Sequence, residues 1–240
     1  MGDSKKISLS DDMQLFLVST VFGYDMTEED SGRRKIREAC IGRAYLDLAR
    51  VIPYKFSSNY IEKYKANDEV IAFVNKKNEF KKTVRKILIG VKETDKASKI
   101  IADVHKSAQE FEEAIFKVDE SIFTYGMAQK WVNMFKKYMW LFGEFKCDNE
   151  NTDMPIDSYI IDALYHEKIL TEDIASDLFK GKVGKNRASD YIKKWSHLNE
   201  DEYNIVQALI KANIPKDKTI LSWENELWMN QAKKLRENGY

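Results

Sequence analysis

The sequence is poor in the residues that interrupt helices. Among 240 residues there are only ten glycines and three prolines. All-β and loop-rich folds need these residues at their turns, so the composition argues against such folds and favours helices. We therefore predict an all-α protein that forms one compact multi-helix unit over residues 1–240. The alternative is two packed helical subdomains with a cleft between them, dividing near residues 90–124.

Residues that bind metals are also scarce. There are two cysteines, Cys40 and Cys147, and three histidines that lie far apart in the sequence. These residues do not have the spacing of zinc ligands. A metal-dependent nuclease or phosphohydrolase would need clustered carboxylates, and Asp157 and Asp162 do not form such a cluster. We predict no metal and no other cofactor.

No apolar run approaches the roughly 20 residues that a membrane-spanning helix requires. The first residues, Met-Gly-Asp-Ser-Lys-Lys, lack the apolar core of a signal peptide. The cytoplasm is therefore the expected location, with no membrane partner. The sequence does not indicate an oligomeric state.

The charge balance excludes a protein that is coated in positive potential. The 39 basic and 39 acidic residues give a formal net charge of zero. A neutral total still allows a basic stripe on one face, because the local field governs the encounter with a polyanion. Two stretches are rich in lysine and arginine, 76–86 and 181–187, and either is a phosphate-contacting face or simply a solvated one.

The most regular helical pattern lies at 129–145. Apolar residues recur there at spacings of three and four, at Trp131, Met134, Phe135, Tyr138, Leu141, Phe142 and Phe145. This spacing predicts a helix with a buried stripe. Lys130 and Asn133 fall at the edge of that stripe, so the lysine stem can follow apolar surface while its amine reaches into a cleft. Partial dehydration there would favour a nucleophilic amine.

A carboxylate is placed at the start of a later helix, which is expected to begin near Pro155. Asp157 follows Pro155 and Ile156 directly. The dipole and the free N–H groups of a helix N-terminus keep such a carboxylate ionised. The simpler interpretation makes Lys130 an ordinary surface lysine and Asp157 a residue that only stabilises its helix.

Together these two segments resemble the helix-hairpin-helix DNA glycosylase superfamily. Gly126 stands four residues before Lys130, where the hairpin of that family has a glycine, and residues 155–160 resemble the segment that carries its catalytic aspartate. The gap of 27 residues between Lys130 and Asp157 is closer to the archaeal 8-oxoguanine DNA glycosylase branch than to endonuclease III-like members. The resemblance is confined to residues 122–160. It departs from the family at Ala128, which replaces a second glycine of the hairpin.

The resemblance implies a catalytic mechanism and a partner. Lys130 would attack the sugar C1′ and form a Schiff base, and Asp157 would assist. The partner would be double-stranded DNA with a damaged or modified base, and the activity would be that of a glycosylase with or without an AP-lyase step. The DNA-binding residues implied are Tyr125, Gly126, Met127, Gln129, Lys182, Lys185 and Arg187.

Two tryptophans are candidates for the pocket that receives the base. These are Trp223 and Trp228, although tryptophans at such spacing are more often core anchors. The competing class of protein is a non-enzymatic helical interaction protein of the immunity, antitoxin or scaffold type, which aromatic richness also suits. An enzyme needs Lys130 and Asp157 to face one cavity, whereas an interaction protein needs an exposed apolar patch.

Overall fold

The computed structural model describes residues 33–49, 51, 67–116, 122–171, 173–174 and 195–237. These residues form helices and connecting segments and contain no strand, so the all-α prediction is confirmed for them. In chain order the elements are α2 (Arg33–Leu48), α4 (Asn67–Gly90), α5 (Ala97–Phe116), α6 (Tyr125–Leu141), α7 (Ser158–His166), the short 3-10 helix η3 (Trp195–His197), α10 (Glu200–Ala212) and α11 (Ile220–Glu237). No helix in the described ranges is long and apolar enough to cross a membrane.

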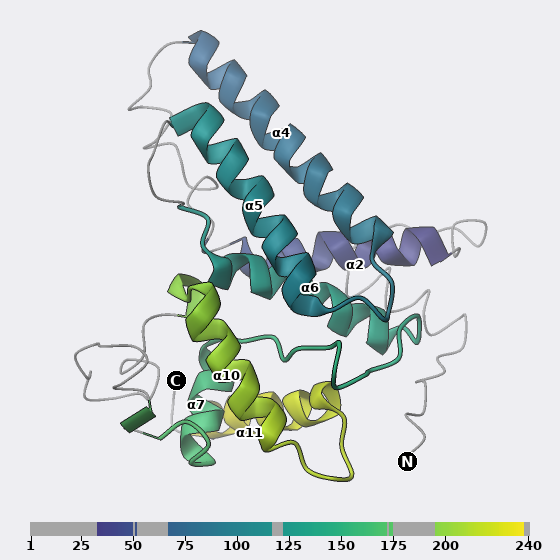
Figure 1. Cartoon of the computed structure of the whole chain (residues 1–240), viewed down its shortest axis with the longest axis vertical. Helices are drawn as coiled ribbons and strands as arrows, with labels where there is room; N and C mark the ends of the chain where they lie inside the picture. The colour runs from purple at the N-terminus through teal and green to yellow at the C-terminus, as the bar shows by residue number, and fades with distance from the viewer. Residues whose placement is uncertain are drawn as a thin grey trace.

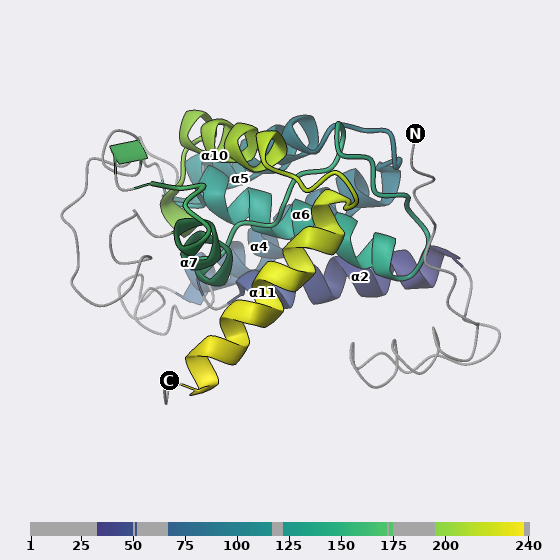
Figure 2. The same ribbon diagram turned by 90° about the horizontal axis from the view of Figure 1, so that it is seen from below.

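Helix α6 lies at the centre of the fold (Figure 1). It packs against α2, α5, α10 and η3, while α4 lies along α5 and α7 lies beside α11 (Figures 1 and 2). Because neighbours surround it, α6 is buried well beyond the single stripe that its apolar spacing predicts. Even its polar side chains Gln129, Lys130, Asn133 and Lys136 are buried.

The first turn of α6 comes earlier than the apolar pattern indicates. The helix begins at Tyr125 because Thr124 caps it, with the Thr124 hydroxyl accepting the N–H of Met127 at 3.2 Å. The N–H of Gly126 donates to the carbonyl of Leu198 at 2.9 Å. A Cβ atom on Gly126 would lie 2.2 Å from the carbonyl oxygen of Trp195. Glycine is therefore required here by the close approach of η3.

An extended segment, 152–157, runs between α6 and α10 and is held by two glutamine side chains. The side-chain oxygen of Gln207 accepts the N–H of Met154 at 3.1 Å, and its amide nitrogen donates to the Met154 carbonyl at 2.7 Å. Gln129 makes the same pair of bonds to Ile156, at 3.2 and 2.7 Å. Buried backbone groups need partners, and each glutamine supplies what a neighbouring strand would supply.

The helix that was expected to begin near Pro155 begins at Ser158 instead. Asp157 is its N-cap, with an extended backbone, and one carboxylate oxygen accepts the N–H of Ile160 at 3.0 Å. Asp157 is therefore placed one residue before the first turn, where the extended segment ends. Its side chain consequently caps α7 and faces α6.

Candidate functional site

The structure brings Lys130 and Asp157 into direct contact. The amine of Lys130 on α6 lies 2.8 Å from a carboxylate oxygen of Asp157 at the N-cap of α7. The lysine side chain is 7% exposed and the aspartate side chain 15% exposed. Two residues that are 27 positions apart in the sequence thus form one largely buried ion pair.

Asp157 is held in its charged form. Burial raises the pKa of its carboxyl group, but the Lys130 charge, the hydrogen bond from Lys130 and the N–H of Ile160 together outweigh that effect. The pKa of Asp157 therefore lies below its ordinary value. A carboxylate that is ionised at neutral pH suits the stabilisation of positive charge better than the uptake of a proton.

The ion pair faces a cavity of about 470 Å³. Residues from α2, α6, α7, η3 and α11 line this cavity, and four of them are aromatic: Tyr138, Tyr159, Trp195 and Trp228. The rings of Tyr159 and Trp228 lie 5.1 Å apart, centroid to centroid, with an angle of 37° between their planes. The volume lies in the range of small-molecule sites, and aromatic faces are suited to stacking against a planar ligand.

A second buried ion pair lines the same cavity, and the sequence analysis missed it. Glu224 on α11 is 1% exposed, and its carboxylate lies 2.5 Å from the amine of Lys137 on α6. Burial raises the pKa of Glu224, the charges of Lys137 and Lys130 lower it, and the net result is a raised pKa. A signal for Glu224 does exist in the sequence. It stands three residues after Leu221 and four before Trp228, a charged residue on the apolar stripe of its helix.

A third ion pair lies at the α2 side of the cavity. Arg43 contacts Asp47 at 3.2 Å, and the hydroxyl of Tyr138 donates a hydrogen bond to Asp47. The cavity is thus lined by three basic and three acidic side chains in matched pairs. Such a lining has no excess of either sign, so a ligand would be recognised by shape, stacking and local hydrogen bonds.

The hairpin residues that were expected to bind DNA are buried. Tyr125, Gly126, Met127 and Gln129 all lie inside the fold. The N–H of Gly126 is donated to Leu198, the N–H of Met127 is donated to Thr124, and the Gln129 side chain is engaged with Ile156. Contact of these residues with DNA stays a prediction. The first turn of α6 packs against η3, so these residues lie beneath η3. The backbone N–H groups of Gly126 and Met127 are already engaged in hydrogen bonds within the protein.

The remaining predicted residues fall into two groups. Lys182, Lys185 and Arg187 lie outside the described residues. Trp228 lines the cavity, whereas Trp223 is not among the lining residues and packs in the core at 7% exposure. Of the two roles considered for Trp223, the structure therefore favours that of a residue packed in the hydrophobic core.

Asn133, the other polar residue at the edge of the predicted stripe, has a structural role. Its side-chain nitrogen lies 2.9 Å from the hydroxyl of Tyr203, which in turn donates to Asp153 at 2.8 Å. Lys211 completes this chain with an ion pair to Asp153 at 2.6 Å. The network ties α6 and α10 to the start of the extended segment that ends at Asp157.

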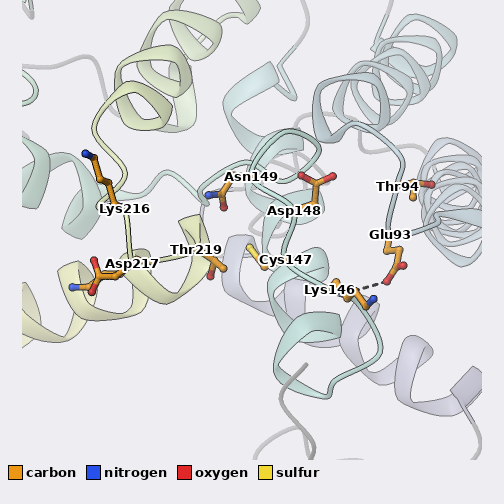
Figure 3. Close-up of a pocket in the computed structure, with 10 residues that line it drawn as sticks. Glu93, Thr94, Lys146, Cys147, Asp148, Asn149, Lys216, Asp217 and Thr219 are labelled. Carbon is orange, nitrogen blue, oxygen red and sulfur yellow. Dashed lines mark hydrogen bonds between the residues drawn. The ribbon is translucent and has the colours of Figure 1, made fainter. Parts of the chain in front are cut away.

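A larger cavity, of about 570 Å³, lies elsewhere on the molecule (Figure 3). Three loops form it, those that precede α5, follow α6 and precede α11. Its charged residues are spread out, with Lys216 and Asp217 on the opposite side from Glu93 (Figure 3). It contains none of the predicted site residues. We therefore assign the candidate site to the smaller cavity.

Within the described residues, no three histidine, cysteine, aspartate or glutamate side chains are grouped so as to hold a metal ion. Comparison with models of known protein families, with curated proteins and with solved structures found no match to the chain. The interpretation of the site therefore depends on its own geometry.

Proposed function

We propose that this protein is a DNA glycosylase, with or without AP-lyase activity, that removes a damaged or modified base through a Schiff base at Lys130. The observation that carries the proposal is the buried contact between Lys130 and Asp157 at 2.8 Å, in a cavity that also contains the Tyr159 and Trp228 rings. Membership of the helix-hairpin-helix superfamily, a duplex DNA partner and a cytoplasmic location belong to the same proposal.

The residues divide the reaction between them. A base that is turned out of the duplex would stack on the aromatic side of the cavity. The neutral amine of Lys130 would attack C1′, and the base would leave with the electrons of the glycosidic bond. Asp157, which the Lys130 contact and the Ile160 N–H keep ionised, would stabilise the positive charge that develops on the sugar. Opening of the sugar ring would then give the imine.

The non-enzymatic alternative has less support. Among the described residues, the large hydrophobic side chains that are exposed are Leu46, Ile205 and Met229, and each lies on a different helix. An interaction surface would gather such side chains into one patch. Lys130 and Asp157 both line one cavity, which supports the enzyme, and we therefore favour it.

Borohydride trapping tests the proposal. The protein is incubated with duplexes that contain 8-oxoguanine, uracil or an abasic site, reduced, and analysed on a denaturing gel. We expect a covalent complex that Lys130→Ala abolishes and that Lys99→Ala, at an exposed lysine of α5, retains. If wild-type protein gives no complex with any of the three duplexes, the proposed function is wrong.

A further inference from the structure

Glu224 is a buried carboxyl group to which the proposed reaction gives no task. It lines the cavity of Lys130 and Asp157 and is 1% exposed. Its partner, Lys137, lies seven residues, about two helical turns, beyond Lys130 on α6, and its amine is 2.5 Å from the Glu224 carboxylate. A buried ion pair contributes little to stability, because the loss of hydration offsets the attraction. A role in the chemistry of the cavity is therefore the better explanation for this pair.

The two carboxyl groups of the cavity differ in how readily they take up a proton. Asp157 has a lowered pKa and Glu224 a raised one, because the charge of Lys130 and the hydrogen bonds to Asp157 together outweigh its burial, whereas burial prevails at Glu224. When two titratable groups of one site have pKa values that are pushed apart, the difference indicates their acid and base roles. Glu224 is the better proton acceptor of the two.

The charges around Glu224 come from several helices. Lys137 contacts it directly, and Lys130 and Asp157 act on it through space, the lysine favouring its ionised form and the aspartate opposing it. Arg43 and Asp47 of α2 line the same cavity as a matched pair. Glu224 thus lies within the electrostatic reach of the amine that has to lose a proton.

We infer that Glu224 transfers the proton of this site, accepting it from the Lys130 ammonium and returning it to the group that leaves C1′. The inference rests on the proposed function. In the first step the ammonium and the carboxylate become an amine and a carboxylic acid. The amine then attacks C1′, and the departing base takes the electrons of the broken C1′–N bond together with the proton from Glu224.

The same proton transfer applies at an abasic site, a substrate that can be tested without knowing which base the protein removes. The amine of Lys130 adds to the C1′ aldehyde and gives a carbinolamine. Its hydroxyl leaves as water with the proton from Glu224, and the nitrogen lone pair forms the protonated imine. The ammonium proton is thus returned and Glu224 ends as a carboxylate, so the protein is ready for another cycle once the imine is resolved.

The test is the rate of imine trapping on an abasic duplex, with enzyme in excess and cyanoborohydride present, measured as a function of pH. We expect Glu224→Gln to be about 100-fold slower than wild type near pH 6 and to approach it near pH 9, where solvent can take the Lys130 proton. The matched control is Glu226→Gln on the same helix, whose side chain pairs with Lys218 at the surface, and it should keep the wild-type profile.

Lys137→Met gives an independent readout. It removes the ammonium that favours the ionised form of Glu224, so the pH at which the rate falls on the acid side should move upward. A purely structural role would lower the rate equally at every pH. The shift in Lys137→Met decides the matter if circular dichroism shows that Glu224→Gln is unfolded.

The outcomes separate the two proposals. If the wild type forms a complex and Glu224→Gln forms it at the same rate and with the same pH profile, the role of Glu224 is overturned. A loss of rate in Glu224→Gln that is uniform across pH overturns it as well. Either result leaves the proposed glycosylase activity in place. No wild-type complex on the abasic duplex overturns the Schiff-base chemistry itself.

Discussion

Gln129 holds Ile156 by both of its backbone groups, with bonds of 2.7 and 3.2 Å. Gln129 directly precedes Lys130, and Ile156 directly precedes Asp157. This pair of hydrogen bonds, here called the Gln129 clamp, therefore lies one residue before the ion pair in both chain segments. It brings α6 and the N-cap of α7 together at the position where the 2.8 Å contact between Lys130 and Asp157 forms.

The first prediction concerns this clamp. Gln129→Leu keeps the volume of the side chain but leaves the N–H and the carbonyl of Ile156 buried without partners. We expect the free energy of unfolding to fall by about 2–4 kcal/mol in urea titrations, because unsatisfied buried groups lose their hydration without compensation. Trapping on abasic DNA should fall as well, since Asp157 is no longer fixed beside Lys130.

The matched control is Gln207→Leu, which releases Met154 in the same way. It should reduce stability by a similar amount, but Met154 lies three residues from Asp157 and the Gln129 clamp stays in place. Trapping by this variant should remain near the wild-type rate under conditions where it is folded. An equal loss of trapping in both variants would show that the clamp has no specific role in placing Asp157.

Local periodicity accounts for what the sequence could predict about the fold. The spacing of Trp131, Phe135 and Tyr138 indicated a buried helix, and the scarcity of glycine and proline indicated the all-α class. The helical wheel also placed Lys130 at the edge of the buried stripe, next to the cavity that it lines. These features depend on residues within a few turns of one another.

Other parts of the site depend on contacts between distant residues and could not be read from periodicity. Gln129 was expected at a DNA-binding surface, because nothing in its neighbourhood shows that its partner is Ile156, 27 residues away. Glu224 meets Lys137 across 87 residues. Gly126 was expected to belong to a DNA-binding hairpin, and nothing in the local sequence indicated its close approach to the backbone of Trp195.

The second prediction tests that close approach. In Gly126→Ala the new methyl group would meet the Trp195 carbonyl oxygen, a backbone atom that cannot move without η3. We expect a loss of about 1–3 kcal/mol in stability, as in other overpacked sites, measured by urea denaturation. Gly42→Ala is the control, because nothing lies within 4 Å of the added carbon and α2 continues through it. That variant should gain about 0.5–1 kcal/mol, and equal losses in both would contradict the contact.

The third prediction separates the two tasks of Asp157. Asparagine is also a good N-cap, so Asp157→Asn should keep α7 while it removes the charge beside Lys130. Asp157→Ala should lose about 1 kcal/mol more, because the N–H of Ile160 then has no side-chain partner. Urea titrations at neutral pH measure this difference, and equal stabilities of the two variants would argue against the cap.

The same carboxyl group gives a pH dependence. Since the pKa of Asp157 is lowered in the folded protein, its contribution is present above the ordinary value and is lost as the pH falls through the folded pKa. The stability difference between wild type and Asp157→Asn should therefore shrink below about pH 4. A difference that stays constant down to pH 3 would mean that Lys130 does not act on this carboxylate.

The last prediction concerns Lys136, a buried lysine outside the cavity. Its amine donates to the carbonyls of Asp95 and Asn151 at 2.7 Å each, and burial lowers its pKa to about 8 although nearby carboxylates oppose the shift. Between about pH 8 and its ordinary value of 10.5 the unfolded chain holds this proton and the folded protein does not. Stability must therefore rise with pH in this window, relative to a variant without the amine. The unfolding free energy of wild type, relative to that of Lys136→Met, should rise by about 2 kcal/mol from pH 8 to pH 10. A difference that does not change over this window would contradict the lowered pKa of Lys136, whose side chain is buried at 2% exposure.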